Sequence, residues 1–290
     1  MPAQVIQIVK KYDEALNKAD SKKYKLSIQL ALDGFSFSIY NDEINKFLSI
    51  ESITFENTSQ IENCCTLLKK TYSEHSWLNL KYKSVNIIFE SQKSTLIPSP
   101  LFDESKKEMY SDFNFAYDEN HEIIHNKLTN LDAYNIYTIP VQIKTTLNDL
   151  FPGHKLQSHS GPLIESLLIL HKNLQFQKRI FVNVRNSYLD IIIIEERKLL
   201  YYNSFNFRSK EDFIYYVIFV LEQLKLNPEE IDLILSGYID KNSKLFDIVF
   251  KYVRNIRFQE LTESFKYSYI FNDIPSHYYF NLLNVGLCEL

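Results

Sequence analysis

The stretch KRIFVNVRNSYLDIIIIEERKLLYYNSFNF, residues 178–207, decides the fold of this chain. It contains three runs rich in β-branched and aromatic residues, which are 180–184, 188–194 and 198–207. Polar turns separate the runs, first at Arg185-Asn186-Ser187 and then at Glu195-Glu196-Arg197. Strand-forming runs with polar turns between them are typical of an antiparallel meander.

A helix and a fourth strand follow the meander. Ser209 is placed to cap a helix over 210–226, because its hydroxyl can accept a hydrogen bond from the first turn. The apolar segment 231–235 then ends at Ser236-Gly237 and predicts a short buried strand. Three antiparallel strands, a crossover helix and a parallel strand form the first part of a ribonuclease-H-like α/β layer.

The first half of the chain repeats this order. The expected elements are strands over 25–32, 35–40 and 46–55, a helix over 61–77 and a buried strand over 85–89. Three landmarks recur at separations of 153, 150 and 146 residues: the first turns at Asp33 and Asn186, the helix caps Ser59 and Ser209, and the fourth strands beginning at Val85 and Ile231. Separations that agree within a few residues predict a duplication.

The boundary between the halves is expected at Phe151-Pro152-Gly153-His154, which gives domains 1–152 and 153–290. An insertion near 93–130 lies in the first domain, and the alternation of Phe113, Phe115 and Tyr117 predicts a hairpin strand within it. Further expectations concern the remaining segments: a frayed arm or short helix over 1–23, strands ending at Pro140 and at Pro275, a loop over 157–161 and a closing helix over 275–290.

Two ribonuclease-H-like halves joined at a helical boundary resemble the actin-like ATPase superfamily. Over most of its length the chain is also similar to an uncharacterised bacterial domain-of-unknown-function family with that fold. The element order carries this resemblance, together with Leu32-Asp33-Gly34 and Leu235-Ser236-Gly237. The expected fold class is therefore α/β, with two ribonuclease-H-like lobes in an actin-like arrangement. The resemblance implies a nucleotide between the lobes, with one hairpin from each lobe against its phosphates.

The hairpins keep little of the superfamily pattern, in which each resembles Asp-x-Gly. Glycine matters there because only a residue without a side chain lets backbone N–H groups approach phosphate closely. Bulky Phe35 follows the first hairpin, Tyr188 follows the second, and a lone glycine replaces the paired glycines of the adenosine-contacting turn. The candidate residues of this vestigial cleft are Asp33, Gly34, Asn186, Ser187 and Gly237. For Asp33-Gly34 and for Gly237, an ordinary turn is the favoured explanation.

Other catalytic patterns are weaker. The segment His121-Glu122-Ile123-Ile124-His125 matches the H-E-x-x-H zinc motif, but its polar flanks favour a strand. On a strand the two histidines would lie about 13 Å apart, so no metal site is expected. A two-metal nuclease is disfavoured because strands 26–32 and 180–184 contain no carboxylates. Ser158-His159-Ser160 is interpreted as a polar loop.

The composition excludes several classes of protein. A hydrophobic fraction of 45% indicates a folded chain, and the net charge of −4 with dispersed basic residues gives no footprint for nucleic acid. The three cysteines offer no disulfide framework, which fits a reducing compartment. The longest apolar run, 213–221, is about half a membrane span, and the N-terminus does not resemble a signal peptide. A cytoplasmic protein without a membrane span is expected.

The expected function is that of a non-catalytic binding or scaffold protein with a degenerate nucleotide cleft and no required cofactor. The resemblance supports this hypothesis, because some superfamily members, including assembly platforms of secretion and pilus systems, act through partner contacts. The protein partner is unknown, and self-association into a homo-oligomer stays open. The alternative is an atypical ATPase that binds Mg-ATP in the interlobe cleft through Asp33.

Overall fold

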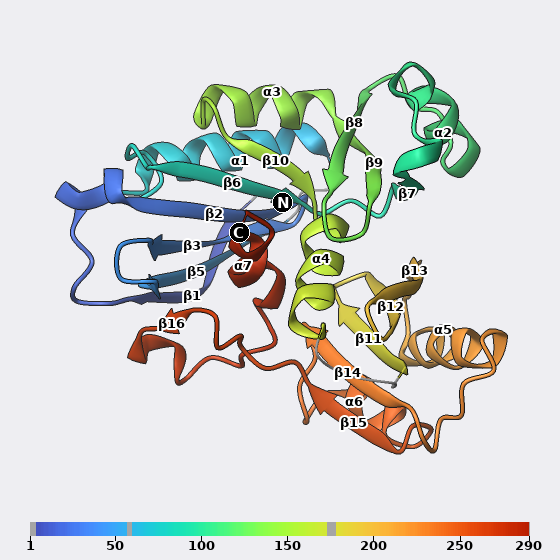
Figure 1. The fold of residues 1–290 in the computed structure, drawn as a ribbon. Helices are drawn as coiled ribbons and strands as arrows, with labels where there is room; N and C mark the ends of the chain where they lie inside the picture. Colours follow the sequence, from blue (N-terminus) through green and yellow to red (C-terminus); the bar gives the residue numbers. More distant parts are fainter. Residues whose placement is uncertain (1–3, 57–59, 173–177, 290) are drawn as a thin grey trace. The chain divides into compact units, whose positions relative to one another are not determined.

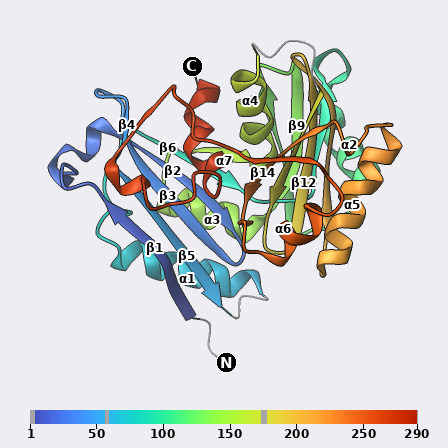
Figure 2. The ribbon, with the colours of Figure 1, turned by 90° about the horizontal axis from the view of Figure 1, so that it is seen from below.

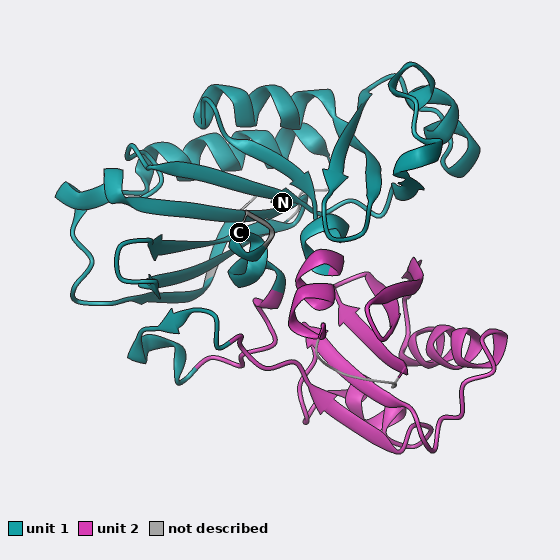
Figure 3. Cartoon of the chain, in the orientation of Figure 1, with its two compact units in different colours: residues 1–163, 263–273, 281–290 teal, residues 164–262, 274–280 magenta. Residues whose placement is uncertain are grey.

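The structure is a computed structural model that describes residues 4–56, 60–172 and 178–289 (Figure 1). The chain divides into two compact units (Figure 3). The first comprises residues 1–163, 263–273 and 281–290, and the second comprises 164–262 and 274–280. The two units are interleaved along the chain, because 263–273 and 281–290 belong to the first unit and follow residues of the second.

The first unit is built on a mixed sheet of eight strands. Six lie in the order β1-β5-β3-β2-β6-β10, and β4 pairs with both β3 and β16. The strands are β1 (Gln4–Tyr12), β2 (Tyr24–Ala31), β3 (Gly34–Asn41), β4 (Lys46–Phe47), β5 (Ser49–Glu56), β6 (Ser84–Phe89), β10 (Lys155–Ser158) and β16 (Lys266–Tyr267). Helices α1 (Ile61–Glu74) and α3 (Val141–Leu150) contribute Cys64, Leu68, Ile143 and Leu147 to the core with this sheet.

Strict alternation in β3 separates an apolar face from a face of small polar residues. Phe35, Phe37 and Ile39 join the core cluster of the first unit. The intervening serines are buried as well, and their hydroxyls are satisfied, with Ser36 Oγ 2.9 Å from Ser52 Oγ and Ser38 Oγ donating to the Ser49 carbonyl at 2.6 Å. Small hydroxyl side chains can therefore occupy a buried face, because each finds a hydrogen-bond partner.

The insertion lies between β6 and α3 and is larger than the sequence predicted. It contains a three-stranded sheet in the order β7-β9-β8 and its own short helices: β7 (Ser94–Pro98), η2 (Ser99–Leu101), η3 (Glu104–Lys106), α2 (Lys107–Asn114), β8 (His121–Leu128) and β9 (Ala133–Pro140). The strand ending at Pro140 thus belongs to the insertion. The hairpin strand predicted around Phe113 and Phe115 is wrong, because Phe113 lies in α2 and β8 pairs with β9 instead.

The second unit holds a five-stranded sheet in the order β13-β12-β11-β14-β15. Its elements are β11 (Lys178–Val184), β12 (Tyr188–Glu195), β13 (Lys198–Asn206), α5 (Lys210–Gln223), β14 (Asp232–Gly237), α6 (Lys244–Val249) and β15 (Asn255–Phe258). Helices α5 and α6 bury one face of the sheet, and Phe181 on the other face contacts His171, which directly follows α4 (Ser160–Leu170). Figure 2 shows α4 and α5 on opposite sides of this sheet.

The predicted duplication is confirmed in the strand order. The segment β5-β3-β2-β6-β10 of the first unit and β13-β12-β11-β14-β15 of the second have the same connectivity and pairing. The two hairpins also match: Ala31 pairs with Gly34 in one, and the Arg185 N–H donates to the Tyr188 carbonyl at 2.8 Å in the other. Asp33 therefore corresponds to Ser187, and Gly34 to Tyr188.

Several predictions for the remaining segments are wrong. The N-terminal arm is β1, paired with β5, followed by η1 (Lys18–Lys23). The expected loop 157–161 comprises the end of β10 and the start of α4, where Ser158, His159 and Ser160 are buried. No strand ends at Pro275 in the described chain, and the closing helix is divided into α7 (Phe280–Asn284) and η5 (Val285–Glu289), after η4 (Tyr269–Phe271). Ser59, the predicted cap of α1, lies outside the described residues.

No helix in the described ranges combines the length and the apolar character needed to cross a membrane.

Candidate functional site

The first candidate hairpin joins β2 to β3 in the first unit, and its turn residues Leu32 and Asp33 are exposed. Gly34 follows with a φ of +148°, and a Cβ there would lie 2.3 Å from the Ile53 carbonyl oxygen. Strand β5 is tied to the same turn, because the Phe55 N–H donates to the Asp33 carbonyl at 2.7 Å. Glycine is thus required at position 34 by the close approach of β5, with no ligand needed to explain it.

Phe35 does not obstruct this turn, contrary to the sequence interpretation. Its side chain is 3% exposed and packs edge-on against Phe55 in the core, with ring centroids 5.8 Å apart. The first hairpin therefore presents Asp33 as its acidic group at the surface, on a short turn without a further glycine.

The second candidate hairpin joins β11 to β12 in the second unit, with Asn186 and Ser187 exposed at its tip. Arg185, at its base, is buried and places its guanidinium 4.3 Å from the centre of the Tyr238 ring. Arg185 Nη2 also lies 3.4 Å from the Tyr238 hydroxyl. A cation held over an aromatic ring and shielded from water is stabilised by the ring quadrupole, so this pair fastens the hairpin to the turn after β14.

Gly237 begins that turn and pairs with Val184 at the end of β11. Its φ is +79°, and a Cβ would lie 2.1 Å from the Val184 carbonyl oxygen. The backbone donors of the turn are all used within the unit: Gly237 N–H bonds to the His277 carbonyl at 2.9 Å, Tyr238 N–H to the Val184 carbonyl at 2.7 Å, and Ile239 N–H to the Gly237 carbonyl at 2.9 Å. The turn thus offers none of these three N–H groups to a nucleotide.

The structure therefore brings Asn186, Ser187 and Gly237 to one end of the second sheet, while Asp33 and Gly34 form a turn of the first unit. Arg185 and Tyr238 are the residues that sequence reasoning missed at this end of the sheet. No local sequence signal pairs them, because the contact depends on the parallel register of β11 and β14.

A buried carboxylate next to the second hairpin was also missed. Asp190 on β12 is fully buried and accepts hydrogen bonds from Asn183 Nδ2 at 3.0 Å, from Ser204 Oγ and from the Tyr202 hydroxyl at 3.4 Å. Ser236 on β14 extends the network by donating to Asn183 Oδ1 at 3.2 Å. A signal was present, since Asp190 is the only charged residue in the apolar run 188–194.

The two histidines of the H-E-x-x-H motif lie on strand β8, as the sequence predicted. His121 Nδ1 is 2.8 Å from Asp118 Oδ2, and the His125 ring packs 5.1 Å from the Phe102 ring. Burial is the main cause of a lowered pKa at His121, opposed by the Asp118 charge. Within the described ranges, no three His, Cys, Asp or Glu side chains are grouped to hold a metal.

Comparison with known proteins identifies the class and then the family. The chain is similar to a Bacteroides thetaiotaomicron protein with an actin-like ATPase fold and unknown function, at 33% identity and a TM-score of 0.75 over 84% of this chain and 93% of that one. The fold is thus that of the actin-like ATPases. Residues 13–256 match the family described as protein of unknown function (DUF3822), and the chain belongs to it.

A more distant similarity shows the fold alone. The type IV pilus biogenesis complex of PilM and PilN matches with a TM-score of 0.58 and 9% identity, over 91% of this chain and 98% of that one. No curated protein sequence matches the chain.

Proposed function

We propose that this protein is a non-catalytic binding or scaffold protein whose nucleotide cleft is degenerate. The observation that carries the proposal is the turn after β14, which stands where the superfamily has its adenosine-contacting turn. Its residues Gly237, Tyr238 and Ile239 bond their N–H groups to carbonyls of the same unit, so these donors are not available to a nucleotide. Arg185, the cation at the base of the second hairpin, is held against the Tyr238 ring.

The carboxylates lead to the same conclusion. Phosphoryl transfer depends on positioned metal ions and donors around the transferred group. Asp33 is the acidic residue of the first turn, and the second turn has Asn186 and Ser187 in its place. Asp190 is the nearest acid along the chain to the second turn, but it is fully buried and its oxygens accept from three side chains. These residues do not fit a Mg-ATP site.

The fold itself supports a role through contacts with another protein. A structure similar to this chain belongs to the PilM-PilN type IV pilus biogenesis complex, which is an assembly of two proteins. A protein partner of this chain is part of the proposal. A cytoplasmic location is part of the same proposal, and it is supported by Cys64 and Cys65, which are free, buried thiols.

A thermal shift with Mg-ATP tests the cleft. Binding at 100 times Kd would stabilise the protein by about 2.7 kcal/mol and raise its melting temperature by roughly 5 to 10 °C. The expected result is a shift below about 1 °C, and release of phosphate from Mg-ATP far below the roughly one per second of ordinary enzymes.

Asp33→Ala is the matched variant, and Glu43→Ala, an exposed acid in the next turn of the same unit, is its control. A shift and a turnover that Asp33→Ala abolishes and Glu43→Ala leaves intact would establish the ATPase alternative. Affinity purification from the native organism, followed by reconstitution with the purified candidate, then identifies the partner.

A further inference from the structure

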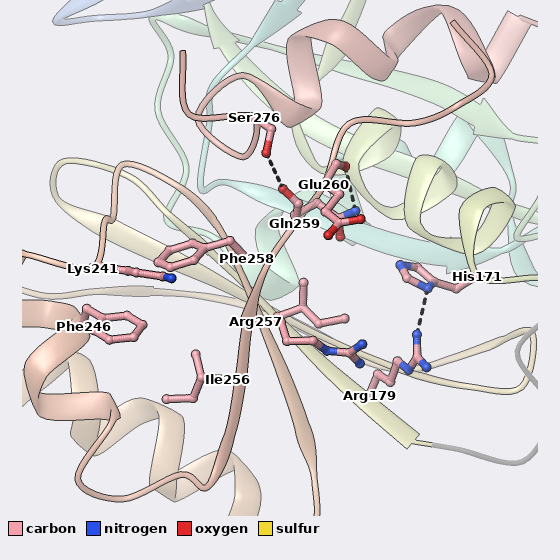
Figure 4. A pocket seen from close by; sticks show the side chains of 11 residues that line it. His171, Arg179, Lys241, Phe246, Ile256, Arg257, Phe258, Gln259, Glu260 and Ser276 are labelled. Atoms are coloured by element: carbon pink, nitrogen blue, oxygen red, sulfur yellow. Dashed lines mark hydrogen bonds between the residues drawn. The ribbon is translucent and has the colours of Figure 1, made fainter. Parts of the chain in front are cut away.

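A cavity of about 550 Å³ lies within the second unit, around strand β15 at the edge of its sheet (Figure 4). This volume is in the range of small-molecule sites. Figure 4 shows His171, Arg179 and Arg257 on one side of β15, and Lys241, Phe246 and Ile256 on the other. We call the first side, with its two arginines, the arginine end.

The two arginines share one carboxylate. Arg257 Nη2 lies 2.5 Å from Asp232 Oδ2, while Arg179 Nε is 3.7 Å from the same oxygen. Lys241 and Glu260 also line the cavity and their charges offset each other. The single negative charge of Asp232 cannot neutralise two guanidinium groups, so the arginine end carries excess positive charge. The consequence is visible at Arg179, where burial and the positive charge of Arg257 lower the pKa despite the opposing charge of Asp232.

His171 adds a hydrogen-bond donor without adding charge. Its pKa is lowered to about 4, chiefly by burial and then by Arg179, so the ring is neutral at pH 7. The Nδ1 atom lies 3.3 Å from Arg179 Nη1 and accepts its hydrogen bond, which leaves the proton on Nε2. The Gln259 amide interacts with the ring, yet His171 Nε2 makes no hydrogen bond of normal geometry.

Arg179 Nε is in the same position. It is buried and makes no hydrogen bond, because the Asp232 oxygen at 3.7 Å is beyond hydrogen-bond distance. Burying a donor without an acceptor costs roughly 1–3 kcal/mol. The unpaired Arg179 Nε, the His171 Nε2–H with its contact to Gln259, and the half-exposed guanidinium of Arg257 lie beside the cavity and match the needs of an oxyanion that accepts several hydrogen bonds.

We propose that the arginine end of this cavity binds the phosphate or carboxylate group of a small metabolite. The guanidinium groups of Arg179 and Arg257 supply planar donors and charge, and the His171 Nε2–H supplies a further donor. Ile234, which pairs with Arg257 across the sheet, provides an apolar wall beside the anion. This ligand site lies in the second unit alone and goes beyond the scaffold role.

Titration calorimetry with inorganic phosphate and with acetate at constant ionic strength tests the site and separates the two chemistries. Binding of either anion with a 1:1 stoichiometry supports the proposal. Absence of binding for both anions at about 20 mM, roughly five times a Kd of about 4 mM, overturns it. A larger phosphate affinity would assign the site to phosphorylated metabolites, and a larger acetate affinity to carboxylates.

Three single variants sharpen the test. Arg257→Gln should weaken binding at least tenfold, because it removes a charge-assisted hydrogen bond. Asp232→Asn should tighten binding several-fold, because it removes the carboxylate that competes with the ligand for both arginines. Arg254→Gln is the control: it changes the charge equally, three residues away, at an exposed side chain that does not line the cavity.

An equal loss of anion affinity in Arg254→Gln and Arg257→Gln would mean nonspecific attraction to surface charge and would overturn the proposal. An Asp232→Asn variant that binds the anion less tightly while melting at the wild-type temperature would also overturn it. The same variants keep the two proposed sites apart. A Mg-ATP shift lost in Arg257→Gln belongs to this cavity, whereas one lost in Asp33→Ala belongs to the hairpins.

Discussion

Replacing Gly237 by alanine tests whether this glycine is there for packing. A methyl group at position 237 would lie 2.1 Å from the Val184 carbonyl oxygen and 2.9 Å from the Val184 nitrogen, and the residue would keep a φ of +79°. Gly153 provides a matched control, because its φ is +77° and a Cβ there meets nothing within 4 Å. Both variants carry the same backbone strain, and only Gly237→Ala adds a clash with backbone.

The magnitudes follow from these two terms. The left-handed conformation costs an alanine about 1–2 kcal/mol, and restricting the unfolded chain returns about 0.4–1 kcal/mol of it. Gly153→Ala should therefore lose about 1 kcal/mol. The contact at Val184 involves backbone that cannot rotate away, and overpacking of this kind costs typically 1–3 kcal/mol more. Gly237→Ala should lose about 2–4 kcal/mol in total.

Urea unfolding followed by circular dichroism measures both losses in the free energy of unfolding, and thermal unfolding checks their rank. The reasoning predicts that Gly237→Ala is the less stable variant by at least about 1 kcal/mol, with no ligand present. Equal stability of the two variants would refute it. A Gly237→Ala protein as stable as wild type, with a changed thermal shift in Mg-ATP, would instead assign the glycine to ligand binding.

Three further predictions concern titration, metal binding and a buried acid. Acidification from pH 6.5 toward pH 4 should lower stability by at most about 3 kcal/mol through His171, because its folded pKa of about 4 lies below the ordinary 6.5 and the unfolded chain binds the proton first. His171→Gln should flatten the curve of unfolding free energy against pH in that window. An unchanged slope would contradict the assignment. Purified protein should contain no stoichiometric zinc by elemental analysis, because His121 and His125 lie on a strand; zinc lost on His125→Ala would show otherwise. Glu51→Gln should cost about 1–3 kcal/mol, because this buried carboxylate lies 3.1 Å from His75 Nε2 and accepts from the Tyr12 hydroxyl. Burial raises the pKa of Glu51, but His75 and Tyr12 lower it by more, so the stability that the variant loses is present above the unfolded pKa and disappears as pH falls. A variant as stable as wild type at pH 7 would refute this role.

The order of the elements in the two repeated sheets could be predicted because each element depends on a short window. In β12 the run Ile191 to Ile194 can form a buried strand on its own composition, and Ser209 caps α5 through its own hydroxyl, bonded to the Asp212 N–H at 3.1 Å. The same local logic in β2, β3 and β6 gave the duplication. These signals need no knowledge of what packs on them.

The contacts of the candidate site could not be predicted, because they join segments distant in sequence. Arg185 meets Tyr238 through the pairing of β11 with β14, and Arg179 meets Arg257 through two neighbouring strand pairs. The α2 error has a different origin: Phe113 is 89% exposed, so the alternation of aromatic residues there did not reflect a buried face at all. Aromatic spacing predicts a strand only where one side is covered.

The matched hairpins show why glycine alone is a poor indicator of a nucleotide site in this fold. Gly34 pairs with Thr54 of β5, and its counterpart Tyr188 pairs with Asn206 of β13, at equivalent places in the two sheets. Only the first is crowded, since a Cβ at position 34 would meet the Ile53 carbonyl at 2.3 Å. The distribution of glycine therefore follows the approach of the neighbouring strand. What decides whether a turn can contact a nucleotide is whether its N–H groups are available, and those of Gly237, Tyr238 and Ile239 are already bonded within the fold.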